Sequence, residues 1–294
     1  MFLLFSLTNS AVVSSITVGD SFEYRIIRSR ITVTVGENSV ETKKFAFGPN
    51  SYFEGTKISV LANFVGEGMN GEFTIKKDSR LFGYTADQFK MKIRQFLFLT
   101  TYFGYNLADN WAYESFDSGY YFFLYPYLIP TGTSWSFFAS LDTYITTTLT
   151  PYAMPGYSLE NNTNYVNNEE EVSFESWVGG EIDSSNGFIY GFTAGLSAKV
   201  SFGNQFQIAF DKTTGLCKGL RIRGWCEGTI NGKSIEISLD YQYETKNYNL
   251  PSLSLGSYNN YFSKLPYLYF LIPSILLPSA IVILLVRKKR TINT

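Results

Sequence analysis

The sequence predicts an α+β protein: a curved, half-barrel-like antiparallel β-sheet with two or more helices on its concave face, plus one C-terminal transmembrane helix. Three observations predict this fold class. Alternating apolar and polar residues occur on both sides of a central region with helical periodicity, and an uncharged apolar run followed by cations ends the sequence. Because the helices are grouped between two runs of strands, the order of elements is that of an α+β fold.

The predicted strands have one buried face. Phe22, Tyr24 and Ile26 alternate with polar residues, which is the period of a strand. "KISVLANFV" and "GEFTIKK" flank a glycine-rich turn and predict a hairpin. Further strands are expected in "GFIYGFTAGLSAKVSF", "QFQIAF", "LCKGLRIRGWCEGTI" and "KSIEISLDYQYE", separated by turns at Gly203-Asn204, Thr214-Gly215 and Asn231-Gly232.

The helical region covers about residues 85–150. Thr85 and Gln88 form a capping box, so a helix is expected to begin near Ala86. Thr133 can cap a second helix that ends before Pro151. Its expected apolar stripe consists of Phe137, Leu141, Tyr144 and Ile145. An Asn- and Glu-rich loop is then expected over 161–171.

The C-terminal region has the pattern of a membrane anchor. Residues 265–286 are 22 residues without a charge, enough to cross a hydrocarbon core of about 30 Å, with a bend at the prolines. The alternative is a buried helix, but a basic cluster follows at once: Arg287, Lys288, Lys289 and Arg290. The positive-inside rule places this cluster in the cytoplasm and the preceding residues outside the cell.

The remaining boundaries follow from this topology. Residues 1–15 form a signal-like segment, with a first β-strand as the alternative. The extracellular domain is expected over 16–249, a stalk over 250–264, the span over 265–286 and the basic tail over 287–294. The sequence therefore predicts a single-pass cell-membrane protein with an extracellular N-terminal domain.

Composition excludes several function classes. The chain contains no His, so the usual base of serine and cysteine nucleophiles and the commonest zinc ligand are absent. Apart from the basic cluster, 20 cations face 25 acidic residues, which argues against nucleic-acid binding. No phosphate loop, nucleophile elbow or metal motif occurs. The sequence predicts neither an enzyme nor a cofactor, although a pair of carboxylates could still serve a glycosidase.

A resemblance accompanies these patterns. "VGDSFEYRI", "SWSFFASL", "FDKTTGLCKGLRIRG" and "YNLPSLSL", followed by a basic-tailed span, resemble the choice-of-anchor S family of archaeal surface proteins over most of the chain. The resemblance implies export, a C-terminal anchor and a β-rich ectodomain, without a known activity or functional residues. The order of strands and helices is also similar to half-barrel lipoproteins that carry lipids, an analogy of fold alone.

Aromatic residues are the main candidates for ligand binding. Aromatic side chains could line a pocket for an apolar molecule, but they could equally fill the space between helices and sheet. The candidates are Trp111, Tyr121, Phe122, Phe123, Tyr125 and Trp135.

Three further candidates depend on export. Cys217 and Cys226 could form a disulfide only if the chain folds back between them, since nine residues of one continuous strand span roughly 30 Å; separate thiols or an intermolecular bond are the alternatives. Asn161 lies in a glycosylation sequon. The carboxylates of 169–171 and Glu175 could bind Ca²⁺, but their spacing matches no calcium loop, so a solvated acidic loop is the alternative.

These observations predict an extracellular interaction or ligand-binding module on a membrane anchor. Its partners would be membrane lipid at the span and a hydrophobic ligand or surface protein at the body. A lipid carrier and a structural component of the cell envelope are the alternative functions.

Overall fold

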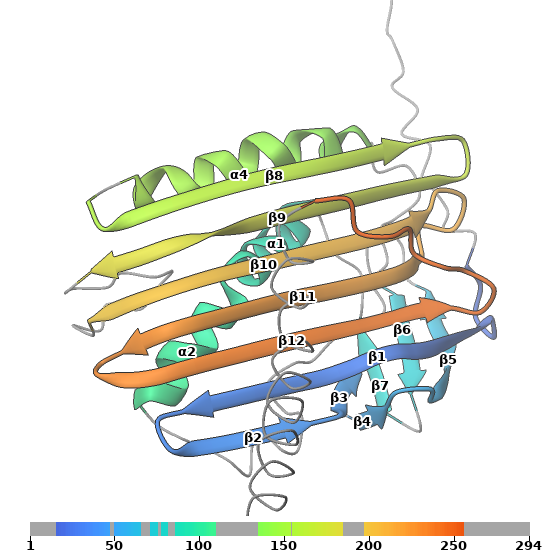
Figure 1. Cartoon of the computed structure of the whole chain (residues 1–294). Helices are drawn as coiled ribbons and strands as arrows, with labels where there is room; N and C mark the ends of the chain where they lie inside the picture. The colour runs from blue at the N-terminus through green and yellow to red at the C-terminus, as the bar shows by residue number, and fades with distance from the viewer. Residues whose placement is uncertain are drawn as a thin grey trace, which may run out of the picture. The chain divides into compact units, whose positions relative to one another are not determined.

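The structure of the chain is a computed structural model that describes residues 16–47, 50–65, 71–75, 78–81, 86–109, 135–153, 155–184 and 197–255. The chain divides into a unit over Met1–Leu255 and a second unit over Gly256–Thr294. All described residues belong to the first unit (Figure 1).

A ten-stranded antiparallel sheet is the framework of this unit, which confirms the predicted antiparallel sheet with short helices packed on it. Its order is β7-β6-β5-β1-β12-β11-β10-β9-β8, and β2 pairs with the C-terminal part of β1. The strands are β1 (Ser21–Val35), β2 (Asn38–Thr42), β5 (Lys57–Val65), β6 (Gly71–Ile75), β7 (Asp78–Leu81), β8 (Tyr157–Asn167), β9 (Glu171–Ser184), β10 (Ala198–Asp211), β11 (Cys217–Ile230) and β12 (Lys233–Thr245). A small second sheet pairs β3 (Lys44–Phe47) with β4 (Asn50–Phe53).

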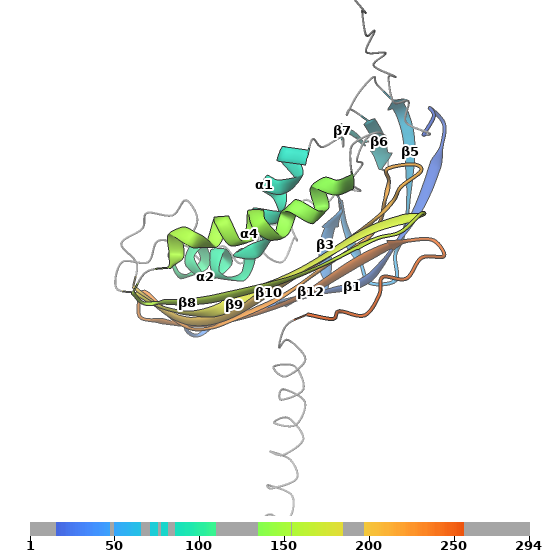
Figure 2. The same ribbon diagram turned by 90° about the horizontal axis from the view of Figure 1, so that it is seen from above.

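Short helices cover one face of the sheet, called here the inner face; Figure 2 shows the sheet curving toward them. They are α1 (Ala86–Leu97), α2 (Leu99–Asp109), η1 (Trp135–Ser140), α4 (Leu141–Leu149) and η2 (Thr150–Tyr152). The expected helix beginning near Ala86 is confirmed, and so is a helix ahead of Pro151. In the second helical segment Phe138, Leu141 and Ile145 are fully buried, whereas Phe137 is partly buried.

Aromatic packing joins the helices to the inner face. The rings of Phe96 and Phe206 stack with their centroids 5.0 Å apart. Phe138 lies 5.6 Å from Phe210 and 6.4 Å from Phe174, again between ring centroids. Since every one of these side chains is at most 7% exposed, their burial supplies much of the hydrophobic stabilisation.

One polar side chain of the sheet fixes the boundary between α1 and α2. Asn204, on the inner face of β10, donates to the carbonyl of Leu97 at 3.1 Å and accepts from the amide of Thr100 at 3.2 Å. The Thr100 hydroxyl in turn donates to the Trp225 carbonyl at 3.0 Å. Gly224 leaves room for this arrangement, because a Cβ there would lie 2.5 Å from Asn204 Oδ1. The helix pair is therefore held in register with β10 and β11.

Two expected loops proved wrong. The turn predicted at Gly203-Asn204 is the middle of β10, which runs unbroken across both residues. The loop predicted over 161–171 is instead the edge strand β8, a short turn, and the start of β9. Asn, Gly and Asp are depleted in strands by local preference, but here cross-strand pairing and contact with α4 override that preference.

Several expectations fall outside the described residues. These are the caps at Thr85 and Thr133, the signal-like segment 1–15, the span 265–286 and the basic cluster at 287–290. Within the described part of the chain, helices are too short or too polar to traverse a lipid bilayer. Residues 250–255, the beginning of the expected stalk, are described and lie on the sheet.

Candidate functional site

The face of the sheet opposite the helices, called here the outer face, is polar over its central strands. Strand pairing places the outward side chains of β9, β10, β11 and β12 in rows. The row Glu175–Gln207–Arg221–Gln242 is followed by Trp177–Gln205–Arg223–Asp240, then Gly179–Gly203–Trp225–Ser238, then Glu181–Ser201–Glu227–Glu236. The inward neighbours in the same strands are mostly apolar, with Ser176 and Asn204 as polar exceptions, so each strand separates a largely hydrophobic layer from a hydrogen-bonding layer.

Residues 246–255, called here the strap, cross this outer face after β12 ends. Figure 1 shows the strap in orange-red, passing in front of β11 and β10 toward β9. In Figure 2 the strap and the helices lie on opposite sides of the sheet. The strap carries no strand of its own. Beyond Lys246, whose amide donates to the Glu23 carbonyl at 2.9 Å, its attachment depends on side chains of the sheet.

The first half of the strap is attached at three positions. Lys218 Nζ lies 4.4 Å from the centroid of the Tyr248 ring, a cation–π geometry. The Leu250 amide donates to Glu244 Oε1 at 2.7 Å, and the Pro251 carbonyl accepts from Gln207 Nε2 at 3.2 Å. The Leu250 side chain rests over Gly219, where a Cβ would lie only 2.9 Å from it.

Glu175 holds the end of the strap. Its carboxylate accepts from the amides of Ser254 and Leu255, at 3.0 and 2.9 Å, and from the Ser254 hydroxyl at 2.9 Å. Gln205 Nε2 donates both to Glu175 Oε1 at 2.8 Å and to the Leu255 carbonyl at 2.5 Å. Glu175 is 4% exposed. A buried carboxylate with this many donors is compensated by charge-assisted hydrogen bonds rather than by one ion pair.

Arginine and aspartate continue the polar layer beyond the strap. Asp240 Oδ2 lies 3.2 Å from Arg28 Nη1 and 3.3 Å from Arg223 Nε. Burial raises the pKa of the Asp240 carboxyl, and the nearby Arg223, Arg28 and Arg221 oppose that shift. Burial also lowers the pKa of the Arg221 guanidinium, with Asp240 opposing. The layer is thus a network of mutually compensating charges.

Two tryptophans lie over the backbone of two glycines, Gly179 and Gly203, in the middle of the outer face. Gly203 is paired with Gly179 on one side and with Trp225 on the other. A Cβ at Gly203 would lie 2.8 Å from Trp225 Nε1 and 3.5 Å from Trp177 Nε1, so both indoles reach over this strand. A Cβ at Gly179 would lie 2.7 Å from the Trp177 ring. The glycines let the indoles approach the backbone closely.

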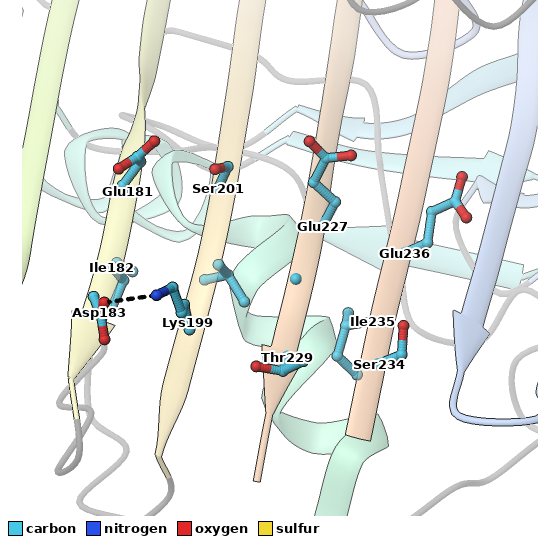
Figure 3. Close-up of a pocket in the computed structure, with 12 residues that line it drawn as sticks. Glu181, Ile182, Asp183, Lys199, Ser201, Glu227, Thr229, Ser234, Ile235 and Glu236 are labelled. Atoms are coloured by element: carbon cyan, nitrogen blue, oxygen red, sulfur yellow. Dashed lines mark ion pairs between the residues drawn. The ribbon is translucent and has the colours of Figure 1, made fainter. Parts of the chain in front are cut away.

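An open groove of about 620 Å³ lies at one end of the four central strands (Figure 3). Glu181, Ser201, Glu227 and Glu236 occupy one cross-strand row in it, and Glu227 stands directly opposite Glu236. Lys199, in the next row, pairs with Asp183 at 3.3 Å. The groove has a negative character, because three carboxylates share one row. Among the described residues, no group of three or more His, Cys, Asp and Glu could hold a metal ion.

The aromatic candidates from the sequence fall into two groups. Trp135 is partly buried and packs on the core, with its ring 5.9 Å from Phe138 and 6.0 Å from Phe210 between centroids. The described member of the set is therefore a packing residue. The others lie outside the described residues: Trp111, Tyr121, Phe122, Phe123 and Tyr125.

The two cysteines are reduced and fully buried, and no disulfide joins them. They stand at separate positions of the continuous strand β11, opposite Phe210 and Phe202. Because the chain does not fold back between Cys217 and Cys226, the geometric condition for a bond between them is not met. Burial, with a smaller contribution from Glu227, raises the pKa of the Cys226 thiol.

The polar candidates lie apart. Asn161 is in β8 rather than a loop, and its amide donates to Thr146 of α4 at 3.4 Å, while Thr163 of the same sequon donates to Asp142 at 2.8 Å. The calcium candidates do not converge. Glu171 pairs with Lys218 at 2.9 Å, whereas Glu175 holds the strap.

Apart from Glu175, which was a calcium candidate, the residues of the outer face were not singled out from the sequence. Their only local signal was the alternation of polar residues in "YQYE", "RIRG" and "QFQI" with apolar ones, which also describes any solvated strand. What distinguishes Gln205, Gln207 and Gln242 is burial, at 2, 4 and 4% exposure, and burial arises from distant parts of the chain.

Comparison with known proteins adds no relationship: the sequence matches no family model, no curated protein and no solved structure.

Proposed function

We propose that this is a single-pass, membrane-anchored cell-surface protein whose N-terminal body is an extracellular interaction or ligand-binding module. The observation that carries the proposal is the 22-residue uncharged segment 265–286 with Arg287, Lys288, Lys289 and Arg290 directly after it. The proposal includes a signal-like segment at 1–15 and relatedness to the choice-of-anchor S surface proteins. In this scheme the sheet and helices form a half-barrel-like body, and binding rather than catalysis is its role.

The strap supports this arrangement. A body held on the cell surface by its C-terminal end needs a defined point where the chain leaves the folded unit. Residues 250–255 provide one, since Glu175, Glu244, Gln205 and Gln207 bind their backbone. The described chain ends at Leu255 on the outer face, only ten residues before the proposed span.

Protease treatment of intact cells tests the topology. The full chain would carry an epitope after Thr294, and external protease should remove the body while a small tagged C-terminal fragment survives. Permeabilised cells provide the control, because the tag should then be lost. Replacing the four cations at 287–290 by Glu should reduce the fraction of correctly oriented chains. A body that stays intact on unpermeabilised cells, under conditions that cleave a known surface protein, would contradict the proposal.

A carrier for hydrophobic molecules has less support from the described residues. The rings between helices and sheet are in contact, with the Phe96 and Phe206 centroids 5.0 Å apart and those of Phe138 and Phe210 5.6 Å apart. The groove of about 620 Å³ is open and has a mixed lining, in which carboxylates and Lys199 stand beside Ile182, Val200 and Ile235. Interaction through the polar outer face is therefore the function that the geometry supports best.

A further inference from the structure

We propose that the outer face of β9–β12 binds a neutral polyhydroxylated ligand, such as a glycan chain, and that the strap covers this surface as a releasable lid. The inference rests on the proposed function, since it names the ligand class of the proposed interaction module. Four features of the described residues support it: the way the strap is held, the unused hydrogen-bonding capacity near it, the tryptophan pair, and the balance of charge.

The strap is attached in a way that permits release. Side chains of Glu175, Gln205, Gln207 and Glu244 bind its backbone at four points, and it adds no strand to the sheet. Release of the strap would therefore leave every pairing of β9 to β12 intact. Segments held by a few such contacts open more readily than the cooperative core of a protein.

The strap uses only part of the hydrogen-bonding capacity of the surface. Six buried polar atoms of outward-facing residues in β9–β12 have no hydrogen-bond partner: Gln205 Oε1, Gln207 Oε1, Gln242 Oε1, Asp240 Oδ1, Arg221 Nε and Trp177 Nε1. The orientation of the three glutamine amides is fixed by their Nε2 groups, because each Nε2 donates to a carbonyl or carboxylate oxygen. Buried groups without partners are uncommon in folded proteins. Hydroxyl groups, which both donate and accept, would satisfy acceptors and donors alike.

The tryptophan pair supplies the apolar part of such a surface. Trp177 and Trp225 converge over Gly203; Trp177 stands in the row of Gln205 and Arg223, and Trp225 stands in the next row. A sugar ring has faces of C–H groups and a rim of hydroxyls, so it fits flat indoles bordered by amides, a carboxylate and guanidinium groups. Large apolar contacts with a few polar groups are the general composition of small-molecule sites.

The charges in the three rows through Glu244, Gln242 and Asp240, which do not include the acidic groove, favour a neutral ligand over an ionic one. Three cations, Arg28, Arg221 and Arg223, accompany three carboxylates, Glu175, Asp240 and Glu244, in adjacent rows. Arg28 and Arg223 both contact Asp240. A phosphate or a basic peptide would meet as many repulsive as attractive groups here, whereas hydroxyls add no charge to the network.

Affinity electrophoresis of the purified full chain tests the inference. The chain would be kept in a polyoxyethylene detergent, since alkyl glycoside detergents carry sugars, and run in native gels containing mannan, dextran or soluble β-glucan. Ser254→Pro removes an amide and a hydroxyl that bind Glu175 without altering the sheet, and Ser252→Pro is the matched control on an exposed strap residue. Faster hydrogen exchange at Leu255 would report release of the strap, and Glu175→Gln provides a second route to release.

The expected result is retardation by at least one polysaccharide, with binding at least tenfold tighter in Ser254→Pro than in Ser252→Pro. Trp225→Ala and Gln205→Met should lose at least tenfold in binding while keeping the wild-type melting temperature within a few degrees. If Ser254→Pro and Glu175→Gln show the released strap yet none of the gels retards them, the inference is overturned. Retardation that survives both Trp225→Ala and Gln205→Met would overturn it as well. Neither result affects the proposed membrane topology, which the protease experiment tests independently.

Discussion

The two faces of the central sheet are built from alternate residues of the same strands but are covered in different ways. The inner face meets helices through rings and aliphatic side chains, such as Phe138 against Phe210. The outer face meets the strap through hydrogen bonds that buried carboxylates accept and buried amides donate, such as the bond from the Ser254 amide to Glu175. Apolar burial is non-directional and stabilises the fold, whereas hydrogen bonds are directional and can be exchanged for those of another partner. The difference suggests a division between a structural face and a recognition face.

The largest test of this division removes a ring from the inner face. Phe138→Ala should lower the free energy of unfolding by about 3–5 kcal/mol, because Phe138 is fully buried among Trp135, Phe174 and Phe210 and a cavity would remain. Urea denaturation followed by circular dichroism measures the change. Phe53→Ala, at a side chain 55% exposed, is the control and should change stability by less than about 0.5 kcal/mol.

A smaller and local effect is expected on the outer face. Ser254→Ala removes a hydroxyl that donates to the buried Glu175 carboxylate, a contact of a kind that contributes about 1.5–3 kcal/mol. The loss should appear as faster amide exchange at Leu255, with the midpoint of global unfolding almost unchanged. Ser252→Ala, at an exposed position of the strap, should leave exchange as in the wild type. If the midpoint of global unfolding falls as well, by an amount that matches the faster exchange at Leu255, the strap belongs to the cooperative core. The two faces would then not differ in the way proposed.

The buried thiol of Cys226 predicts a pH effect from the inner face. Burial raises its folded-state pKa, while in the unfolded chain a thiol ionises near pH 8.5. Above that pH the unfolded state binds fewer protons than the folded state, so this group should lower stability by about 1.4 kcal/mol per pH unit. Urea denaturation of the wild type and of Cys226→Ala between pH 8 and 10 measures this effect. The free energy of unfolding should fall less steeply with pH in the variant than in the wild type. Identical slopes would contradict the assignment.

The smallest effect is expected at the acidic groove. Glu236→Lys places a cation opposite Glu227 and should stabilise the sheet by about 0.2–1 kcal/mol, because like charges directly across a ladder repel. Salt should weaken the gain. Glu37→Lys, an exposed carboxylate in the β1–β2 turn, is the charge-matched control. Destabilisation by Glu236→Lys alone would indicate that the carboxylate row has a structural partner.

Much of the fold could be predicted from local patterns. The side chains of Ile235, Ile237 and Leu239 in β12 do lie in the hydrophobic core. Asn231 and Gly232 have the positive φ values, 50° and 75°, of a tight hairpin turn. The predictions failed where tertiary contacts override local preference. The Asn-rich strand β8 is held by β9 and α4, and Gly179 and Gly203 are strand residues whose missing side chains admit the tryptophans.

The sequence alone determined which residues of each predicted strand are apolar, where the tight turns lie, and the apolar, basic-tailed pattern of the C-terminal region, because these are properties of neighbouring residues. Only the tertiary structure decided that β1 pairs with β12, about two hundred residues away, and that Glu175 binds Leu255. Such contacts depend on the register of strands distant in the chain, and periodicity carries no information about which distant segments meet. The buried polar face is therefore a product of the fold.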